Sequence, residues 1–171
     1  MKNLITYEEI SQLARPCSTD REMAEAMIAE AQRVEIKPRL GDALYLKLME
    51  GGELPDPYRL LLEGGRWESA CNGPQLLTGV KTALAYYALA RIVRDGNIQA
   101  TTYGAVVKDD QYSADAERSE RQRQYRELFS QADSYLAEAV RFLTINGRDF
   151  PEYKVCGKMR SNRTTIKIIG K

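Results

Sequence analysis

The chain has 171 residues, 43% of them hydrophobic and 29% charged, which suits a single soluble domain with a sizeable core. It has three cysteines and no histidine, which excludes a Cys/His zinc site and both Ser-His-Asp and Cys-His catalysis. The net charge of +1 is uneven: residues 154–171 hold six basic side chains and no acidic ones, which leaves a net of −5 for residues 1–153. We therefore expect one domain over residues 1–153 and a basic tail over residues 154–171.

The first third of the sequence predicts two capped helices. Thr6 and Glu9 match a capping box, and the helix that they begin should end near Ala14, before Pro16. Thr19 and Glu22 repeat the pattern and predict a second helix to about Ile36. Its apolar side is expected to comprise Met23, Met27, Ile28, Ala31 and Val34.

Two further helical segments follow, and glycine pairs end them. Pro38 should kink or restart the helix, and a face with Leu40, Leu44, Tyr45 and Leu48 then continues to Gly51-Gly52. Asp56 is expected to cap a short helix over 58–63, which Gly64-Gly65 ends. Neither glycine pair has the Gly-Lys-Ser/Thr ending of a phosphate loop.

The middle of the chain predicts a hairpin, a buried helix and an extended segment. Trp67 lies before the turn dipeptide Asn72-Gly73, so residues 66–75 suggest a short hairpin. Residues 76–95 are apolar on most faces, which is typical of a central buried helix, and Tyr86 and Tyr87 should pack in the core. Residues 98–110 are expected to form an extended segment or loop.

The dominant predicted element is one long helix over residues 113–146. Its second half carries an apolar stripe of Tyr125, Leu128, Phe129, Ala132, Leu136, Ala139, Phe142 and Leu143. Its first half is almost entirely polar, with charges spaced to pair along the helix, such as Glu120 with Arg123. This half should form a solvated face, a subunit interface or a wall near DNA.

The tail permits three interpretations: a disordered end, an arm that docks on another protein, or a weak contact with nucleic acid. Its last part, residues 164–169, favours a β-strand and has no strand of its own to pair with. Together with the polar half of the long helix, it supplies the candidate contacts between subunits. They are Asp115, Arg118, Arg121, Arg123, Arg126, Lys158, Arg160, Arg163 and Lys167.

Several phrases, in their order along the chain, resemble the head-tail connector (head-completion, or adaptor) proteins of tailed bacteriophages and prophages. The resemblance covers about residues 5–153. The phrases are Ile36-x-Pro38-x-Leu40-Gly41-x-x-Leu44-Tyr45, Leu61-Leu62-Glu63-Gly64-Gly65 before Trp67, Thr78-Gly79-Val80-Lys81, Tyr86-Tyr87-x-x-Ala90-Arg91, Thr102-Tyr103-Gly104-x-Val106, Tyr135-Leu136, Asn146 and Phe150-Pro151-x-Tyr153.

The resemblance implies a mainly α protein, with four to five helices, one long C-terminal helix and minor β structure. It implies a structural role: a homo-oligomeric ring beneath the portal protein that extends the DNA channel and docks the tail or stopper protein. Non-specific contact with the packaged DNA is compatible with this role. The protein would be made in the host cytoplasm and reside in the virion, with no enzymatic activity, cofactor, metal or membrane contact.

Two other functions remain open at this point. The first is a non-specific nucleic-acid-binding helical protein, whose affinity for DNA would depend on the tail and fall steeply with salt. The second is an enzyme with a carboxylate site, which would need distant Asp and Glu residues to converge in a polar pocket.

Overall fold

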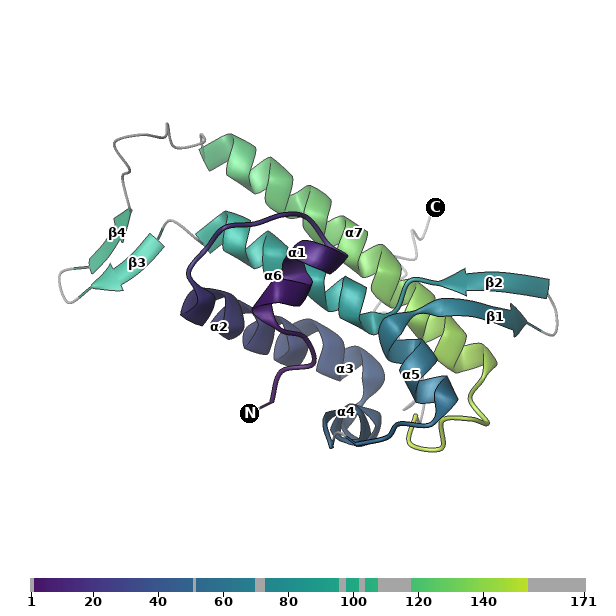
Figure 1. Cartoon of the computed structure of the whole chain (residues 1–171). Helices are drawn as coiled ribbons and strands as arrows, with labels where there is room; N and C mark the ends of the chain where they lie inside the picture. Colours follow the sequence, from purple (N-terminus) through teal and green to yellow (C-terminus); the bar gives the residue numbers. More distant parts are fainter. Residues whose placement is uncertain are drawn as a thin grey trace, which may run out of the picture.

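The computed structural model describes residues 2–50, 52–69, 73–95, 98–101, 104–107 and 118–153. Most of these residues are helical (Figure 1). In chain order the elements are α1 (Tyr7–Leu13), α2 (Arg21–Ala31), the π-helical turn η1 (Gln32–Ile36), α3 (Lys37–Leu40), α4 (Asp42–Met49), α5 (Asp56–Glu63), β1 (Gly65–Ser69), β2 (Gly73–Leu77), α6 (Val80–Asp95), β3 (Ile98–Thr101), β4 (Gly104–Val107) and α7 (Arg118–Ile145).

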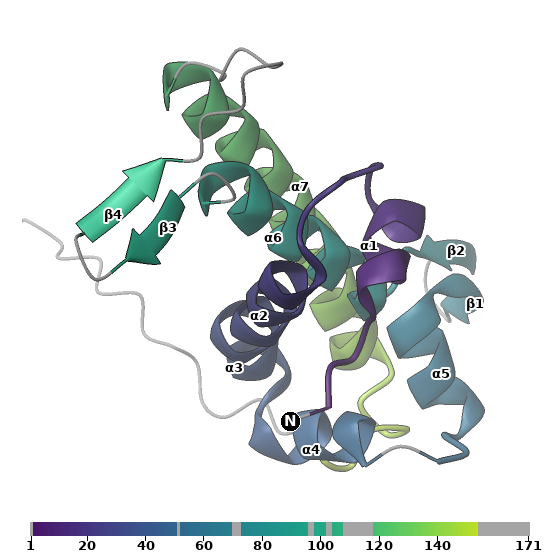
Figure 2. The same ribbon diagram turned by 60° about the vertical axis from the view of Figure 1, so that its left-hand side comes forward.

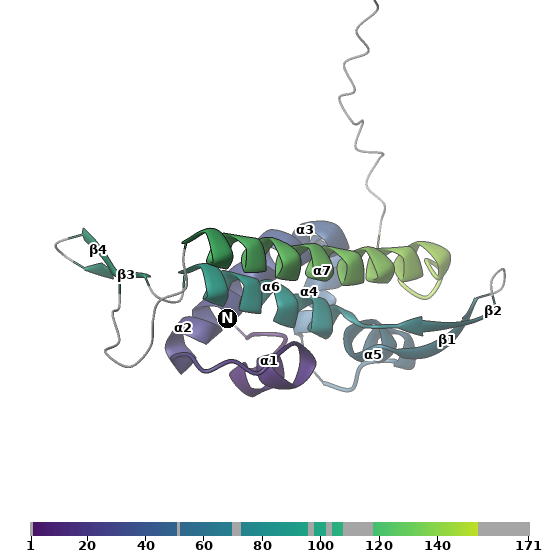
Figure 3. The same ribbon diagram turned by 90° about the horizontal axis from the view of Figure 1, so that it is seen from above.

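The body of the protein is organised around α6 and α7, which lie side by side along their length (Figure 3). On α7 the buried positions are Leu128, Ala132, Leu136, Ala139, Phe142 and Leu143, all from the predicted stripe. Helices α1, α2 and α5 pack against other parts of α6, which buries ten of its sixteen residues. A helix buried to this extent is the centre of the core, as its composition predicts.

The mainly α class, the long C-terminal helix and the minor β structure are confirmed. Helices α2 and α3 run through η1 without a break, so the described residues form six continuous helices rather than four or five. The two antiparallel hairpins, β1–β2 and β3–β4, lie at opposite ends of the helical body (Figure 2). Residues 108–117 lie outside the described residues, as does the whole tail, so the predicted start of the long helix at Ser113 stays a prediction.

The central helix begins later than the sequence predicts. Leu76 and Leu77 belong to β2, where Leu76 is 74% exposed, and α6 starts only at Val80. The reason is Gly79, whose φ of 92° is a left-handed conformation that no residue of an α-helix adopts. The apolar run of the sequence thus spans a strand, a turn and a helix.

The apolar side of α2 also differs from the prediction. Val34 is 56% exposed, and Ile36 is buried in its place. The π-helical turn η1 adds one residue to a helical turn and so moves the inward face by one position. Pro38 follows directly in α3, so the predicted kink takes the form of a π-turn ahead of the proline.

Of the predicted caps, the one at Thr6 is confirmed and two others are wrong. Thr6 accepts from the Glu9 amide, while the Glu9 carboxylate accepts from the Thr6 amide at 2.7 Å. The residue that precedes α2 is Asp20 rather than Thr19, and it makes no side-chain cap. Asp56 is the first residue of α5 and lies inside the helix, after Pro55.

Candidate interaction surfaces

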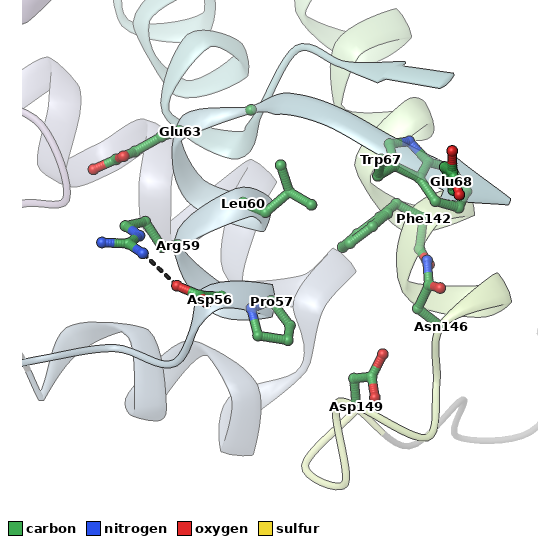
Figure 4. A pocket seen from close by; sticks show the side chains of 11 residues that line it. Asp56, Pro57, Arg59, Leu60, Glu63, Trp67, Glu68, Phe142, Asn146 and Asp149 are labelled. Atoms are coloured by element: carbon green, nitrogen blue, oxygen red, sulfur yellow. Dashed lines mark hydrogen bonds and ion pairs between the residues drawn. The ribbon is translucent and has the colours of Figure 1, made fainter. Parts of the chain in front are cut away.

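A hollow of the described surface lies between α5, β1 and the C-terminal end of α7 (Figure 4). It encloses about 460 Å³ and is called the acidic pocket below. Short connections bring its walls together, because Gly64 ends α5 and leads directly into β1. Its lining comprises Asp56, Pro57, Arg59, Leu60, Glu63, Gly64, Trp67, Glu68, Phe142, Asn146 and Asp149.

Aromatic rings form the apolar floor of the acidic pocket. Trp67 meets the edge of Phe142 with ring centroids 5.0 Å apart, and Phe142 in turn contacts Phe150 at 5.7 Å. Phe142 and Phe150 are buried, whereas Trp67 is half-buried. The indole therefore offers an aromatic surface to a ligand while its inner edge is fixed by packing.

The rim of the acidic pocket carries an excess of negative charge. It has four carboxylates and a single cation, Arg59, which is bound to Asp56 one turn earlier in α5 (Figure 4). Glu63, Glu68 and Asp149 are exposed and form no ion pair with another described residue. Such a rim favours a cationic partner, and the floor favours its aliphatic or aromatic portions.

The first turns of α7 form a second surface and contain the predicted contact residues that the structure describes. Arg118, Arg123 and Arg126 are exposed, and Arg121 is partly buried. Arg123 pairs with Glu127 at 3.9 Å, a different partner from the predicted Glu120. An open hollow of about 470 Å³ continues this polar face from Arg126 along the next two turns of α7.

This polar part of α7 is attached to the end of α6 by an aromatic contact. The Arg94 guanidinium lies 5.0 Å from the centroid of the Tyr125 ring and also binds the Asp95 carboxylate at 2.6 and 2.8 Å. The helix is thus held at Tyr125, while Arg123 and Arg126 beside it are exposed. The other predicted contacts, Asp115, Lys158, Arg160, Arg163 and Lys167, lie outside the described residues, so their role as contacts stays a prediction.

A buried charge cluster joins three helical elements around Arg91, whose side chain is only 7% exposed. Its two terminal nitrogens donate to Glu30 and Glu35, each at 2.5 Å. Burial raises the pKa of the Glu35 carboxyl, and the Arg91 charge opposes that shift. On the same helix, Tyr87 donates to Asp133 of α7 at 2.6 Å, and burial together with this bond raises the pKa of the phenol.

The Arg91 cluster includes a residue of the π-turn. Glu35 is in η1 and Glu30 is in α2, and the extra residue of the turn allows both carboxylates to reach the same guanidinium. Arg91 and Glu35 are paired at low exposure, whereas the Glu30 side chain is 47% exposed, and this pairing is the pattern of a structural ion cluster. Among the described residues, no three Cys, Asp or Glu side chains are arranged to hold a metal ion.

Residues 36–163 match a protein family described as a family of unknown function, DUF6712. The chain belongs to this family. The matched region of the DUF6712 chain begins at the end of η1 and includes every wall of the acidic pocket, both hairpins, α7 and ten residues of the tail. No curated protein and no solved structure matches the chain. No helix in the described part of the DUF6712 chain is long and apolar enough to cross a membrane.

Sequence reasoning did not find the acidic pocket. Its walls come from residues separated by almost a hundred positions, from Asp56 to Asp149, and no short motif connects them. One usable signal is Trp67, because the only tryptophan of the DUF6712 chain stands next to Glu68 on a short strand. A large aromatic residue beside a charge on an exposed hairpin is a frequent component of a contact surface.

Proposed function

We propose that this chain is a structural head-tail connector of a tailed phage or prophage virion. In this role copies form a ring under the portal protein, extend the DNA channel and provide a docking surface for the tail or stopper protein. The protein acts by assembly and not by catalysis. The nucleic-acid-binding function is the alternative against which the experiment below is designed.

The observation that carries the proposal is the place of the resembling phrases in the fold. Ile36, Leu40, Leu44 and Tyr45 of the first phrase are all buried. The second and third phrases meet at Gly64 and Gly79, where two connections cross at backbone contact. Residues that determine packing and chain crossings specify a fold, so a shared set of them supports kinship with the connector proteins.

Two surfaces are suited to assembly in a ring. The polar start of α7 is at one end of the helical body and the acidic pocket is at the other, next to β1 (Figure 1). Distinct contact surfaces at opposite ends are what a head-to-tail interface requires, and such an interface gives a ring when the rotation closes. The charged rim of the pocket and Arg118, Arg123 and Arg126 of α7 are exposed, so both surfaces are accessible to partners.

The proposal is tested by binding to the portal protein encoded in the same genome, measured by co-sedimentation. We expect the intact chain to sediment with the portal, and a variant with Arg118→Gln, Arg123→Gln and Arg126→Gln to bind more weakly. The matched control, Arg15→Gln with Arg141→Gln and Arg148→Gln, removes the same charge from exposed sites elsewhere and should bind normally. No binding to the portal, combined with salt-sensitive binding to duplex DNA, would favour the alternative.

A further inference from the structure

The acidic pocket and the tail are the two parts of this chain with strong and opposite charge. We infer that the acidic pocket receives the basic tail, residues 154–171, of a second copy of the same chain. The shared family region contains both parts, since it spans the pocket and continues to residue 163. The docked tail would join neighbouring copies without using the polar face of α7.

Charge complementarity is the first support. Arg59 is paired with Asp56, so Glu68 and Asp149 present carboxylates without an ion-pair partner among the described residues, whereas the Glu63 carboxylate points away from the aromatic floor (Figure 4). The tail supplies six basic residues and no acidic one. Opposite charge at this density both attracts the partner and excludes acidic segments.

The floor of the pocket suits the same occupant. Trp67 and Glu68 are consecutive residues of β1, and both line the pocket (Figure 4). A lysine or arginine can lay its aliphatic stem on the half-buried indole while its charged end remains near the acidic rim. The tail has such residues at closely spaced positions, with Lys158, Arg160 and Arg163 within six residues.

The edge of β1 offers backbone partners for the rest of the tail. Within the described part of the chain β1 pairs only with β2, so its outer edge has unpaired backbone groups. Residues 164–169 (Thr-Thr-Ile-Lys-Ile-Ile) have a strong preference for β structure. If this segment adds to the edge of β1, next to the pocket, the backbone N–H and C=O groups of the edge and of the segment would hydrogen-bond to each other.

The contacts of residue 152 show where the tail leaves the described body. Tyr58 donates a hydrogen bond of 2.5 Å to Glu152, which fixes the point where the tail begins. In α5, Tyr58 is on the side opposite to Leu60 and Glu63, because these positions are about 160° and 140° away around a helix with 3.6 residues per turn. Asp149, five residues before the tail, itself lines the pocket, so the dilution series below is designed to separate a neighbour's tail from the chain's own.

Trp67 makes the inference measurable, because the emission of the only tryptophan reports on the pocket itself. The full-length chain is followed over a dilution series by tryptophan emission and by mass from sedimentation velocity. We expect the emission to shift to shorter wavelength as concentration and mass rise, and high salt to reverse both changes. A shift that is present at every dilution without a rise in mass would assign the pocket to the chain's own tail and overturn the inference.

Two variants and a control identify the partners. Neutralising the tail (Lys158→Gln, Arg160→Gln, Arg163→Gln) and neutralising the pocket (Glu68→Gln, Asp149→Asn) should each abolish the shift and the rise in mass. The control Asp20→Asn with Glu22→Gln removes two exposed carboxylates near the start of α2, at the other end of the body from β1, and should behave as the intact chain (Figure 1). Assembly of either neutralised variant to the same extent as the intact chain would overturn the inference.

Mixing gives the sharpest result. The tail variant keeps its pocket and the pocket variant keeps its tail, so a mixture of the two should form pairs and nothing larger. The inference rests on the proposed function in one respect, because both require copies of the chain to associate. The measurements described here use no portal protein. Tail docking can therefore fail while portal binding succeeds, and the reverse. A mixture in which both variants stay monomeric would contradict docking between copies.

Discussion

Gly64 and Gly79 touch each other through their backbones. A β-carbon on Gly79 would lie 2.6 Å from the Gly64 nitrogen, and one on Gly64 would lie 2.4 Å from the Leu77 carbonyl oxygen. Both glycines have left-handed φ values, 81° and 92°. At this crossing the connection from α5 to β1 passes the connection from β2 to α6, so it sets the position of the hairpin that carries Trp67.

The first prediction concerns this crossing. Gly64→Ala and Gly79→Ala should each destabilise the fold through the left-handed φ, about 1–2 kcal/mol, plus a further ~1–3 kcal/mol for forced overlap. Gly41→Ala is the control, because Gly41 has a φ of 79° and open space around it, so only the first cost applies. Urea denaturation measures the free energy of unfolding of all three variants. Equal losses of stability for Gly41→Ala and Gly64→Ala would contradict the close backbone contact at Gly64.

The second prediction concerns the buried cluster. Arg91→Met should lower the free energy of unfolding by about 3–5 kcal/mol, because Glu35 is left as a buried charge without its partner. Arg21→Met, which breaks exposed pairs with Glu8 and Glu25, should cost less than about 1 kcal/mol. The double variant Arg91→Met with Glu35→Leu should recover part of the loss, and no recovery would argue against the unpaired charge as its cause.

The third prediction tests the register of η1. Ile36→Ala should cost about 2–5 kcal/mol as a core truncation. Val34→Ala should change the stability by less than about 0.5 kcal/mol, because Val34 is mainly in solvent. Both variants are measured by chemical denaturation. A larger loss of stability for Val34→Ala than for Ile36→Ala would contradict the π-turn and favour the regular helix that the sequence predicts.

The fourth prediction is a pH dependence at Tyr58 and Glu152. The Tyr58 hydrogen bond holds the pKa of Glu152 below its ordinary value, while burial, followed by Glu152, raises the pKa of Tyr58 to about 12. A lowered carboxyl pKa stabilises the fold above the ordinary range of glutamate and loses that effect as pH falls through the folded-state value. At the alkaline end, stability falls above the ordinary tyrosine range, because the unfolded phenol ionises before the folded one.

Tyr58→Phe is the variant for this pair, and it should cost about 1 kcal/mol at neutral pH. The difference from the intact chain should shrink in acid, and the pKa of Glu152, followed by carboxyl NMR, should rise towards its usual range. Tyr7→Phe removes a hydroxyl elsewhere on the surface as a control. A Glu152 pKa that is the same in Tyr58→Phe and the intact chain would show that the hydrogen bond is not its cause.

Some local features of the fold were predictable from sequence, although the caps at Thr19 and Asp56 were not, and features that depend on distant residues were missed. The capping box at Thr6 and the stripe on α7 need only neighbouring positions, and both are confirmed. The exposure of Val34 accompanies the π-turn η1, whose Glu35 is paired with Arg91 far along the chain. Likewise, nothing in the sequence around Gly79 distinguishes it from other glycines near a helix. Its close contact with Gly64 is visible only in the fold, and α6 starts directly after it.

The candidate site follows the same division. The exposed arginines at the start of α7 were predicted as contacts from the polar half of a long helix, and Arg118, Arg123 and Arg126 are indeed exposed. The acidic pocket depends on the packing of Trp67 against Phe142 and on the position of Asp149 beyond the end of α7. These relationships are tertiary, so no periodicity or motif in the sequence could indicate them.

The most direct measurement of the central claim is the mass of the assembly by light scattering. The intact chain is measured over a concentration series at low and high salt, alone and mixed with the portal protein of the same genome. We predict a ring of defined mass, formed either alone or on the portal, which weakens at high salt. A chain that stays monomeric at every concentration and does not bind the portal would contradict the connector role.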